Sequence, residues 1–280
     1  MNAPASMVSW PVRHNLFGVQ VSSTHYDEVV DTVIRAAQAG QRGMVDFMPA
    51  HLLTAVAGDA EFRRRMDDFD IVAPDGQPVR WALNFFHKTA LKERVYGPET
   101  TRRLCGAAAE HGIPIYLYGG TEQVLATLKA KLLEWFPALK IAGAEAPPFR
   151  PLTPEEDAAA VKRINDSGAK LVFLGIGSPK QEIFAHNHMH SIHAVQLCVG
   201  AAFDFHAGSK KMAPAWMQKR GLEWLFRLTQ EPKRLWKRYL VANTTFVYLF
   251  GRELAARPFR KLFSRSSARQ KPVLGETPAA

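Results

Sequence analysis

The sharpest local signal for chemistry is the stretch Gly175–Glu182, which reads Gly-Ile-Gly-Ser-Pro-Lys-Gln-Glu. An apolar segment ends there in two glycines, and Ser178 and Pro179 suit the cap and the first turn of a helix. Glycines let the backbone approach a ligand closely, and the free N–H groups at a helix start attract phosphate. The stretch therefore predicts a phosphate site, although a capped strand–helix turn without a ligand fits the pattern equally well.

Two further turns could contribute to such a site. Tyr118-Gly119-Gly120-Thr121 has the same strand–turn–helix form, and two such turns in one parallel sheet favour a nucleotide crevice at its carboxyl edge. Asp75-Gly76 follows the short apolar run Ile71–Ala73. Asp-Gly strongly favours a turn, and the pattern alone favours that interpretation. The alternative is that Asp75 acts as a general base toward an attacking hydroxyl group.

The remaining reactive residue types form no recognisable site. Asp68-Phe69-Asp70 matches an Asp-x-Asp metal pattern, but it lies between an expected helix and strand and is better interpreted as a solvated helix end. His186 and His190 would share a helix face, yet no carboxylate or cysteine completes a metal pattern. Cys105 and Cys198 have no flanking pattern of a nucleophile and fit structural roles in a reducing compartment. We predict no metal site and leave any metal requirement open.

Short apolar runs alternate with helical patterns from about residue 43 onward. The expected strands are Met44–Phe47, Ile71–Ala73, Ile113–Tyr118, Lys140–Ala142, Leu171–Ile176 and Val195–Val199. The expected helices are Ala50–Met66, Pro78–Phe86, Glu99–Glu110, Glu122–Phe136, Pro154–Asp166 and Pro179–His190. This alternation predicts an α/β fold whose parallel sheet is covered by helices on both faces. Thr153 and Glu156 have the spacing of a capping box.

The composition is that of a folded protein. With 280 residues, of which 47% are hydrophobic, the chain can form one large domain or one domain with an appendage. The start of the chain lacks the basic and apolar segments of a signal peptide, and no segment reaches the roughly 18 apolar residues of a membrane span. These features predict a protein that stays in the cytoplasm.

Charge is distributed unevenly along the chain. Residues 209–280 carry 16 Lys and Arg against 4 Asp and Glu, whereas the first 208 residues have a net charge of −2. Within this basic region, Ala213–Leu228 and Pro232–Phe250 have the pattern of helices that mix aromatic and basic side chains. We therefore divide the chain into a core (1–208), a basic amphipathic helical appendage (209–263) and a frayed tail (264–280). Such asymmetry indicates an anionic partner, either a membrane surface or a nucleic acid.

Taken together, several stretches resemble the WecG/TagA/CpsF glycosyltransferases. The similarity runs in order over about residues 16–250 and is carried by Ala73–Gly76, Arg94–Pro98, Tyr116–Gly120, Gly175–Glu182, Val199–Phe205, Gly221–Leu228, Glu231–Trp236 and Arg238–Tyr239. The form Asp75-Gly76-x-Pro78-Val79-x-Trp81 is most similar to the exopolysaccharide branch of the family.

The resemblance implies a Rossmann-like fold, a UDP-sugar donor, inversion at the anomeric carbon and a polyprenyl-diphosphate-linked sugar as acceptor. It implies that Asp75 is the catalytic base, and that Gln181 and its neighbours bind the nucleotide. The nucleotide-binding residues expected in the matching stretches are Gly119, Gly120, Gly177, Ser178, Lys180, Gln181, Glu182 and Asp204. No permanently bound cofactor is expected.

The resemblance also gives the appendage a role. Arg220, Arg227, Arg234 and Arg238 lie in the part thought to close over the active site and to touch an anionic membrane, and Arg227 and Arg234 are expected to reach the diphosphate. The enzyme would then be peripheral on the inner face of the cell membrane, acting in the synthesis of exopolysaccharide or another cell-surface polysaccharide. A homo-oligomer is left open.

One departure from the family pattern affects the expected site. Teichoic-acid members carry a Thr-x-Asn before the Asp-Gly, and counting back from Asp75 places Phe47 and Pro49 at these two positions. His51 resembles the His of an Asn-x-His variant, and Asp46 lies close by. We expect His51 or Asp46 to contact the acceptor or the sugar, unless the transferred sugar itself differs; a His51 that only caps or packs its helix is the alternative.

Two other functions remain to be separated from sugar transfer. A Rossmann-type nucleotide-dependent enzyme of other chemistry would be expected to carry Gly-x-Gly-x-x-Gly after a first strand, and the sequence has none there. A nucleic-acid-binding protein would use the basic tail and would bind oligonucleotides in a salt-dependent manner. We favour the glycosyltransferase, with no nucleic acid as partner; the sequence does not name the sugar.

Overall fold

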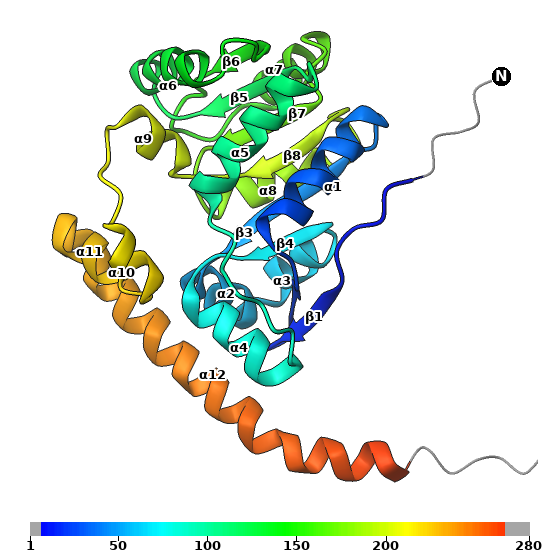
Figure 1. Cartoon of the computed structure of the whole chain (residues 1–280), viewed down its shortest axis with the longest axis vertical. Coiled ribbons are helices and arrows are strands. Elements are labelled where there is room, and N and C mark those ends of the chain that lie inside the picture. The colour runs from blue at the N-terminus through cyan, green and yellow to red at the C-terminus, as the bar shows by residue number, and fades with distance from the viewer. Residues whose placement is uncertain (1–6, 267–280) are drawn as a thin grey trace, which may run out of the picture.

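The computed structural model describes residues 7–266, with side chains described as far as Arg257, and has the α/β architecture that the sequence predicts (Figure 1). In chain order the elements are β1 (Arg13–Leu16), β2 (Val19–Ser22), α1 (Tyr26–Gln38), β3 (Gly43–Met48), α2 (Ala50–Gly58), α3 (Ala60–Asp67), β4 (Ile71–Pro74), α4 (Gln77–His87), α5 (Gly97–Glu110), β5 (Ile115–Gly119), α6 (Glu122–Trp135), β6 (Ile141–Glu145), α7 (Pro154–Asp166), β7 (Leu171–Gly175), α8 (Lys180–Asn187), β8 (Val195–Cys198), α9 (Ala202–Ala207), α10 (Ala215–Lys219), α11 (Glu223–Gln230) and α12 (Pro232–Ser266).

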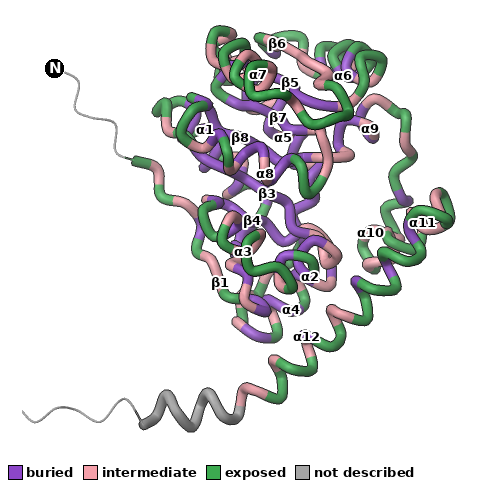
Figure 2. Tube along the Cα trace, turned by 180° about the vertical axis from the view of Figure 1, so that it is seen from behind, coloured by how far each residue is buried: buried purple, intermediate pink, exposed green. Residues whose placement is uncertain are grey.

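The centre of the molecule is a six-stranded parallel sheet in the order β4-β3-β8-β7-β5-β6. Helices α1, α5, α6 and α9 contribute to the hydrophobic core on one face, and α2, α3, α4, α7 and α8 to the core on the other. Because both faces are covered, a central strand such as Leu171–Leu174 is apolar and buried throughout rather than alternating. Figure 2 shows this buried centre inside a more exposed layer of helices.

The first 42 residues form elements that the periodicity did not predict. Strands β1 and β2 make a short antiparallel hairpin, and α1 follows it. The hairpin lies beside the edge strand β4, where the Val72 N–H donates to Ser22 Oγ at 3.1 Å. Strands of four residues are too short for their alternation to stand out from the sequence.

Two expected helices are each divided in two. Asp59 interrupts Ala50–Met66, because its side chain accepts hydrogen bonds from the N–H groups of Glu61 and Phe62 and so begins α3 as a new helix. Ala213–Leu228 is divided into α10 and α11 around Gly221, whose φ of +73° is left-handed.

Two predicted helix starts have different outcomes. The capping box at Thr153 is confirmed: Thr153 Oγ1 accepts from the Glu156 N–H, and Glu156 accepts from the Thr153 N–H. The predicted cap at Ser178 is wrong, because α8 begins at Lys180 after Pro179 and has no side-chain cap. Its first turn leaves the Ser178 hydroxyl outside the helix.

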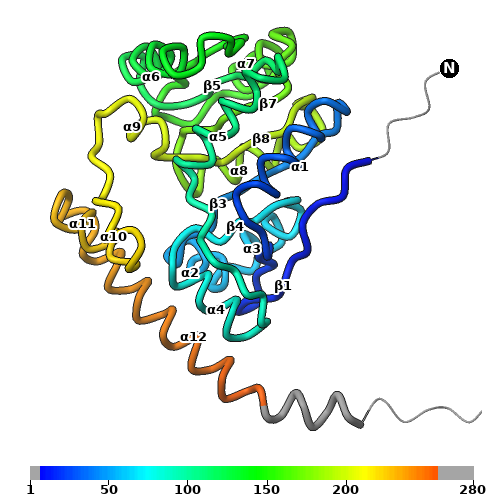
Figure 3. Tube along the Cα trace, viewed as in Figure 1, coloured from blue at the N-terminus to red at the C-terminus, as the bar shows by residue number. Residues whose placement is uncertain are grey.

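Helices α10–α12 form the appendage, and α12 runs past α2 and α4 (Figure 3). Leu235, Tyr239, Ala242 and Leu249 are buried on its inner side. Phe246 contacts Phe17, and Phe250 contacts Phe85 and Phe86 of α4. Within the described residues, no helix has the length and apolar character needed to cross a membrane. Of the tail predicted at 264–280, the first three residues continue α12, and residues 267–280 lie outside the described residues.

Candidate active site

The carboxyl ends of the parallel strands open into a cavity of about 1510 Å³. Its walls come from the segments that follow all six strands of the sheet, and α11 and α12 of the appendage line another side. A drug-sized ligand typically occupies a pocket of about 300–1,000 Å³. The cavity is therefore large enough to hold two substrates together.

Most of the site residues that the sequence predicts line this cavity. They are His51, Asp75, Gly120, Gly177, Ser178, Lys180, Gln181, Glu182, Asp204, Arg227 and Arg234. Gly119 does not line it. The position of Gly119 has a packing reason instead, since a Cβ there would lie 2.4 Å from the carbonyl carbon of Gly175 on the neighbouring strand.

The glycines of the two turns therefore differ in role: some are needed for close packing, and one faces open space. Gly119 and Gly175 allow β5 and β7 to approach each other closely, and a Cβ on Gly175 would lie 2.5 Å from the ring of Phe203. Gly177 has a left-handed φ of +82°, and a Cβ at this position would have no neighbour within 4 Å, so Gly177 faces open space. Of these glycines, Gly177 is the one whose backbone a ligand could approach.

Asp75 lies at the bottom of the cavity, immediately after β4. The Asp75 N–H donates to the Met48 carbonyl at 3.1 Å, which extends the pairing of β3 with β4 by one residue and fixes the backbone there. Burial raises the pKa of Asp75 from its ordinary 3.8 to about 6, even though Arg94 opposes this shift. A carboxyl group with a pKa close to neutrality is suited to accept a proton during a reaction.

Arg94 and Glu223 complete the surroundings of Asp75, and the sequence did not identify either as a site residue. Arg94 lies 3.7 Å from Asp75 Oδ1 and donates to Glu223 Oε2 at 2.6 Å. Its guanidinium also stacks over the ring of Tyr96, 4.2 Å from the centroid. Arg94 and Tyr96 belong to a stretch that carried the family resemblance, but the pairing of Arg94 with Glu223 joins positions 129 residues apart.

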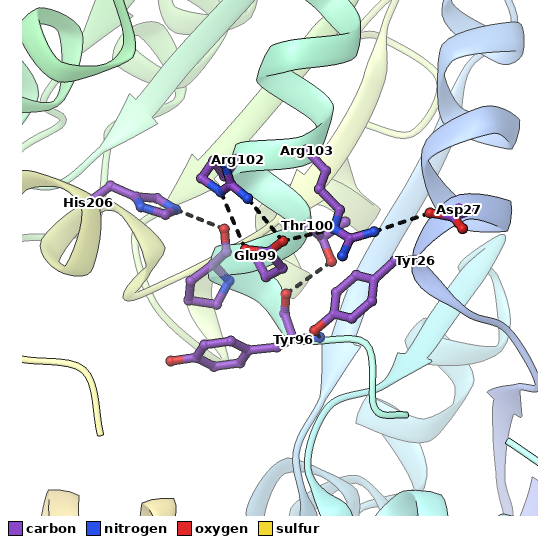
Figure 4. A network of polar contacts seen from close by, with 9 residues as sticks. Tyr26, Asp27, Tyr96, Glu99, Thr100, Arg102, Arg103 and His206 are labelled. Atoms are coloured by element: carbon purple, nitrogen blue, oxygen red, sulfur yellow. Dashed lines mark hydrogen bonds and ion pairs between the residues drawn. The ribbon is translucent and has the colours of Figure 1, made fainter. Parts of the chain in front are cut away.

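A polar network holds the start of α5 at the cavity wall (Figure 4). The Tyr96 N–H donates to the Tyr26 hydroxyl at 3.0 Å, and the His206 ring nitrogen Nε2 donates to the Pro98 carbonyl at 2.8 Å. Arg103 bridges Glu99 of its own helix and Asp27 of α1. These contacts attach both α1 and α9 to α5, so Tyr96 and Pro98 have a fixed position beside Asp75.

The residues after β7 form a buried polar group at the start of α8. Gln181 is 5% exposed and Glu182 is fully buried, and Gln181 Nε2 donates to Glu182 Oε1 at 3.1 Å. Gln181 Oε1 has no hydrogen-bond partner among the described residues. Glu182 accepts one N–H of the Gln181 amide, and the unpaired Gln181 oxygen is a buried acceptor at the wall of the cavity.

Asp46 lies beneath this group and does not reach the cavity. Its side chain is fully buried, and its carboxyl group lies against that of Glu182, to which a protonated Asp46 donates a hydrogen bond. Burial, followed by the nearby carboxyl group of Glu182, raises the pKa of Asp46 well above its usual 3.8; burial also raises the pKa of Glu182. Asp46 is therefore a core residue, and the expectation that it could contact substrate is wrong for this position.

The buried Asp46 predicts an unusual pH dependence of stability. An acid whose pKa is raised in the folded state binds more protons folded than unfolded, so stability is lost as the pH rises above about 4. Asp46→Asn should remove this loss, and its melting temperature relative to the unmodified protein should increase between pH 4 and pH 8. Asp67→Asn, at an exposed position, is the control and should show a constant difference across the same range. A constant difference for Asp46→Asn as well would contradict the prediction.

His51 lies where α2 meets the appendage. Its ring contacts that of Tyr239, with centroids 6.5 Å apart, and both residues line the cavity. Burial, followed by the positive charges of Arg238 and Arg227, lowers the pKa of His51 to about 3. His51 is therefore neutral near pH 7 and offers a hydrogen bond rather than a charge. Phe47 and Pro49, which stand where teichoic-acid members have Thr and Asn, also line the cavity. Neither side chain has a hydroxyl or amide group, so this part of the wall is apolar.

The arginines of the appendage differ in how deeply their side chains are buried in the cavity. Arg227 stacks over the ring of Phe205 at 4.9 Å and lies near Asp75 and Tyr96. Arg234 pairs with Glu231 at 2.7 Å and has a side chain that is 64% exposed. Asp204 also lines the cavity and is paired with Lys210 at 2.9 Å. Arg227 and Arg234 therefore offer positive charge in the cavity for an anionic ligand.

Two histidines at the end of α8, His186 and His188, pair with acids rather than with each other. His186 lies 3.0 Å from Asp68, and His188 lies 3.1 Å from Asp157. Asp70, the other acid of the Asp-x-Asp pattern, accepts from the Met44 N–H at 2.9 Å. Among residues 7–257, no cluster of three or more His, Cys, Asp or Glu side chains is arranged to hold a metal ion.

Comparison with known protein families agrees with the fold. Residues 14–260 match the family described as Glycosyl transferase WecG/TagA/CpsF, which covers the parallel sheet, the cavity residues and most of α12. The match therefore includes the appendage as well as the core. The chain belongs to the WecG/TagA/CpsF glycosyltransferase family, and it is a glycosyltransferase.

Proposed function

We propose that the protein is an inverting glycosyltransferase that moves a sugar from a UDP-sugar to a polyprenyl-diphosphate-linked sugar, in the synthesis of exopolysaccharide or another cell-surface polysaccharide. The observation that carries this proposal is the position of Asp75. Its carboxyl group has a pKa of about 6 and lies at the bottom of a cavity that is large enough for donor and acceptor. A hydroxyl group bound beside it would lose its proton as it attacks.

The two halves of the cavity suit the two substrates. Gly177, Ser178 and Gln181 follow β7, where backbone N–H groups and the free Gln181 acceptor are available to a nucleotide. Asp75 and His51 follow β4 and β3 on the other half, where the appendage lies over them. This arrangement supports a UDP-sugar on the β5–β7 side and the acceptor sugar between Asp75 and the appendage.

The proposed reaction needs one proton transfer and one displacement. Asp75 takes the proton of the acceptor hydroxyl group while the oxygen of that hydroxyl group bonds to the anomeric carbon. The bond from the anomeric carbon to the UDP oxygen breaks at the same time, with inversion. The leaving diphosphate carries negative charge, which N–H groups and cations stabilise in the transition state. Arg227 supplies a cation within the cavity; a divalent metal ion could supply another, and turnover with and without Mg²⁺ measures that contribution.

The outward side of α12 supports a position on the membrane surface. Trp236, Leu240 and Val247 are 55%, 57% and 71% exposed, and helical spacing places them in one stripe, about 100° around the helix axis from the buried Leu235 and Tyr239. Exposed lysines at 233 and 237 flank this stripe. Aromatic and basic side chains together suit the boundary of lipid headgroups, where the proposed acceptor is anchored.

The proposal is tested by a turnover assay of the purified protein with a panel of UDP-sugars and a synthetic prenyl-diphosphate-sugar acceptor, with Mg²⁺ and with EDTA. Release of UDP that depends on the acceptor is the expected result. A thermal-shift screen with UDP, NAD and a short oligonucleotide separates the alternatives, since a ligand of the native state raises its stability. Stabilisation by NAD or by the oligonucleotide, but not by UDP, would overturn the proposal.

Gln181→Ala should weaken UDP binding while the fold is retained. The variant removes the free acceptor and the contact with Glu182. A lost hydrogen bond to a ligand typically costs about 0.5–1.5 kcal/mol, or roughly a 2- to 13-fold higher Kd. Titration calorimetry with UDP measures the change, and an unchanged melting temperature shows that folding is intact. Gln123→Ala, on the exposed side of α6, is the matched control and should bind UDP normally.

A further inference from the structure

Three charged side chains from separate parts of the chain form a row at the bottom of the cavity. Asp75 follows β4, Arg94 precedes α5, and Glu223 is the first residue of α11 in the appendage. Their side chains are 16%, 10% and 12% exposed. Arg94 lies between the two acids, yet it is much closer to Glu223, at 2.6 Å, than to Asp75, at 3.7 Å.

We propose that Glu223 is a positioning residue of the appendage that holds Arg94 away from Asp75 and thereby keeps Asp75 basic enough to accept the acceptor proton. The inference rests on the proposed function of Asp75 as the base. Glu223 itself does not touch a reacting atom in this proposal. It acts through Arg94, whose charge would otherwise be directed at Asp75 alone.

The physical reason is competition between two carboxylates for one guanidinium. A cation close to a buried carboxylate stabilises its ionised form and makes it a weaker base. Short charge-assisted hydrogen bonds are the strongest contacts of this type. Burial raises the pKa of Asp75 to about 6, and the negative charge of Glu223, which is hydrogen-bonded to Arg94, adds to this rise and opposes the lowering effect of Arg94.

Several other groups also face Asp75. Arg227 lies one turn further along α11, where it pairs with Glu223 at 3.6 Å, and the Gly97 N–H interacts with Asp75 from the start of α5. Tyr26, Tyr96 and Asp46 also interact with Asp75 electrostatically, from α1, the segment before α5 and β3. A change in the titration of Asp75 in a Glu223 variant would therefore report on Glu223 together with the two arginines that it pairs with, Arg94 and Arg227.

Docking of the appendage is what brings Glu223 to Arg94. Arg94 Nη2 also donates to Gln218 Oε1 at 3.2 Å, and Gln77 Nε2 donates to the Lys219 carbonyl at 3.3 Å. Gly221, between these helices, approaches the Gln77 side chain closely, since a Cβ there would lie 3.1 Å from Gln77 Cβ. The seating of α10 and α11 on the core thus sets the environment of the base as well as covering the cavity.

The pH dependence of turnover tests the inference. In the unmodified protein, turnover should rise with pH around pH 6, where Asp75 loses its proton. Glu223→Gln should move this rise to lower pH by about 1 unit and lower the plateau, because Arg94 and Arg227 then act on Asp75 without the opposing charge of Glu223. Arg94→Gln should move it to higher pH, and the double variant should lie between the two. Glu61→Gln breaks a surface ion pair of the same 2.6 Å length and should not move it.

Three readouts distinguish a positioning role of Glu223 from a purely structural one. Glu223→Asp keeps the charge and should restore most of the wild-type profile, which also covers the case in which Glu223→Gln does not fold. A lower plateau with an unmoved pH profile in Glu223→Gln would overturn the inference and leave a purely structural role. If no donor and acceptor pair is turned over, titration of ¹³Cγ-labelled aspartate by NMR, with Asp75 assigned through Asp75→Asn, measures the same shift without the reaction. Full turnover by Asp75→Asn would instead refute the proposed base, which is a separate failure.

Discussion

Asp75→Asn should lower turnover by about 100-fold or more, the scale of lost general-base catalysis, while UDP affinity stays nearly unchanged. The amide is close in size to the carboxyl group, so the loop after β4 should keep its place through the bond from the residue 75 N–H to the Met48 carbonyl. The amide cannot accept a proton, and the acceptor hydroxyl would have to attack in its neutral form. Steady-state turnover with saturating donor and acceptor, and calorimetry with UDP, measure the two effects.

A second acid of the same cavity provides the control. Asp157 lines the cavity from α7 and pairs with His188 at 3.1 Å, away from Asp75 and the appendage. Asp157→Asn removes one carboxylate from the cavity and should cause a much smaller loss of turnover than Asp75→Asn. Equal losses in the two variants would indicate that the net charge of the cavity matters rather than a base at position 75. Near-normal turnover by Asp75→Asn would end the assignment.

The fold could be predicted from the sequence wherever local and long-range signals agree. The strands of the central sheet are covered on both faces, so they appear as continuous apolar runs such as Leu171–Leu174, and each is followed by a helical pattern. Helix α7 begins at a capping box that Thr153 and Glu156 define locally. The break at Asp59 was missed because Asp in a helical pattern resembles a solvated helix residue until its bonds to Glu61 and Phe62 are seen.

The sequence predicted the site residues that have a local turn signal, but not those whose partners lie far away along the chain. Asp75 and Gly177 each follow an apolar run, and both are residue types that favour turns. Both line the cavity. Gly119 gives the same local signal but serves the packing of β5 on β7. The residue type of Arg94 does not indicate a site by itself. Its place beside Asp75 becomes apparent only through its pairing with Glu223 of α11, which lies 129 residues further along the chain.

The appendage is bound to the core too closely to be treated as a separable tail. Leu249 belongs to the core cluster beside Phe17 and Phe86, and the ring of Phe250 packs against that of Phe86 at a tilt, with centroids 4.7 Å apart. A chain that ends at Gly208 would expose these aromatic rings to water, and the expected loss of apolar burial would destabilise the fold. Substitutions on the outward side of α12 test its role without disturbing this contact.

Lys233→Glu combined with Lys237→Glu should lower binding to anionic vesicles by roughly 30-fold or more, with UDP affinity and melting temperature nearly unchanged. Both lysines are exposed on α12 beside Trp236, so neither contributes to the core. Each basic residue near an anionic surface contributes on the order of 1 kcal/mol, and about 1.4 kcal/mol corresponds to a tenfold change in binding. Sedimentation with vesicles that contain phosphatidylglycerol or only phosphatidylcholine measures the effect, which should be confined to the anionic ones and weaken with salt.

A control variant distinguishes the position of the two α12 lysines from their effect on the net charge. Lys129→Glu combined with Lys140→Glu changes the net charge by the same amount at exposed positions on and just after α6, away from α12. This control should retain most of the vesicle binding, because only a surface that faces the bilayer lies within a Debye length of the headgroups. The α12 variant should also turn over a lipid-linked acceptor in vesicles poorly while it turns over a water-soluble acceptor normally, since the cavity is unchanged. Equal losses of vesicle binding in both variants would mean that net charge alone attracts the protein, and unchanged binding in the α12 variant would mean that another surface of the enzyme meets the membrane.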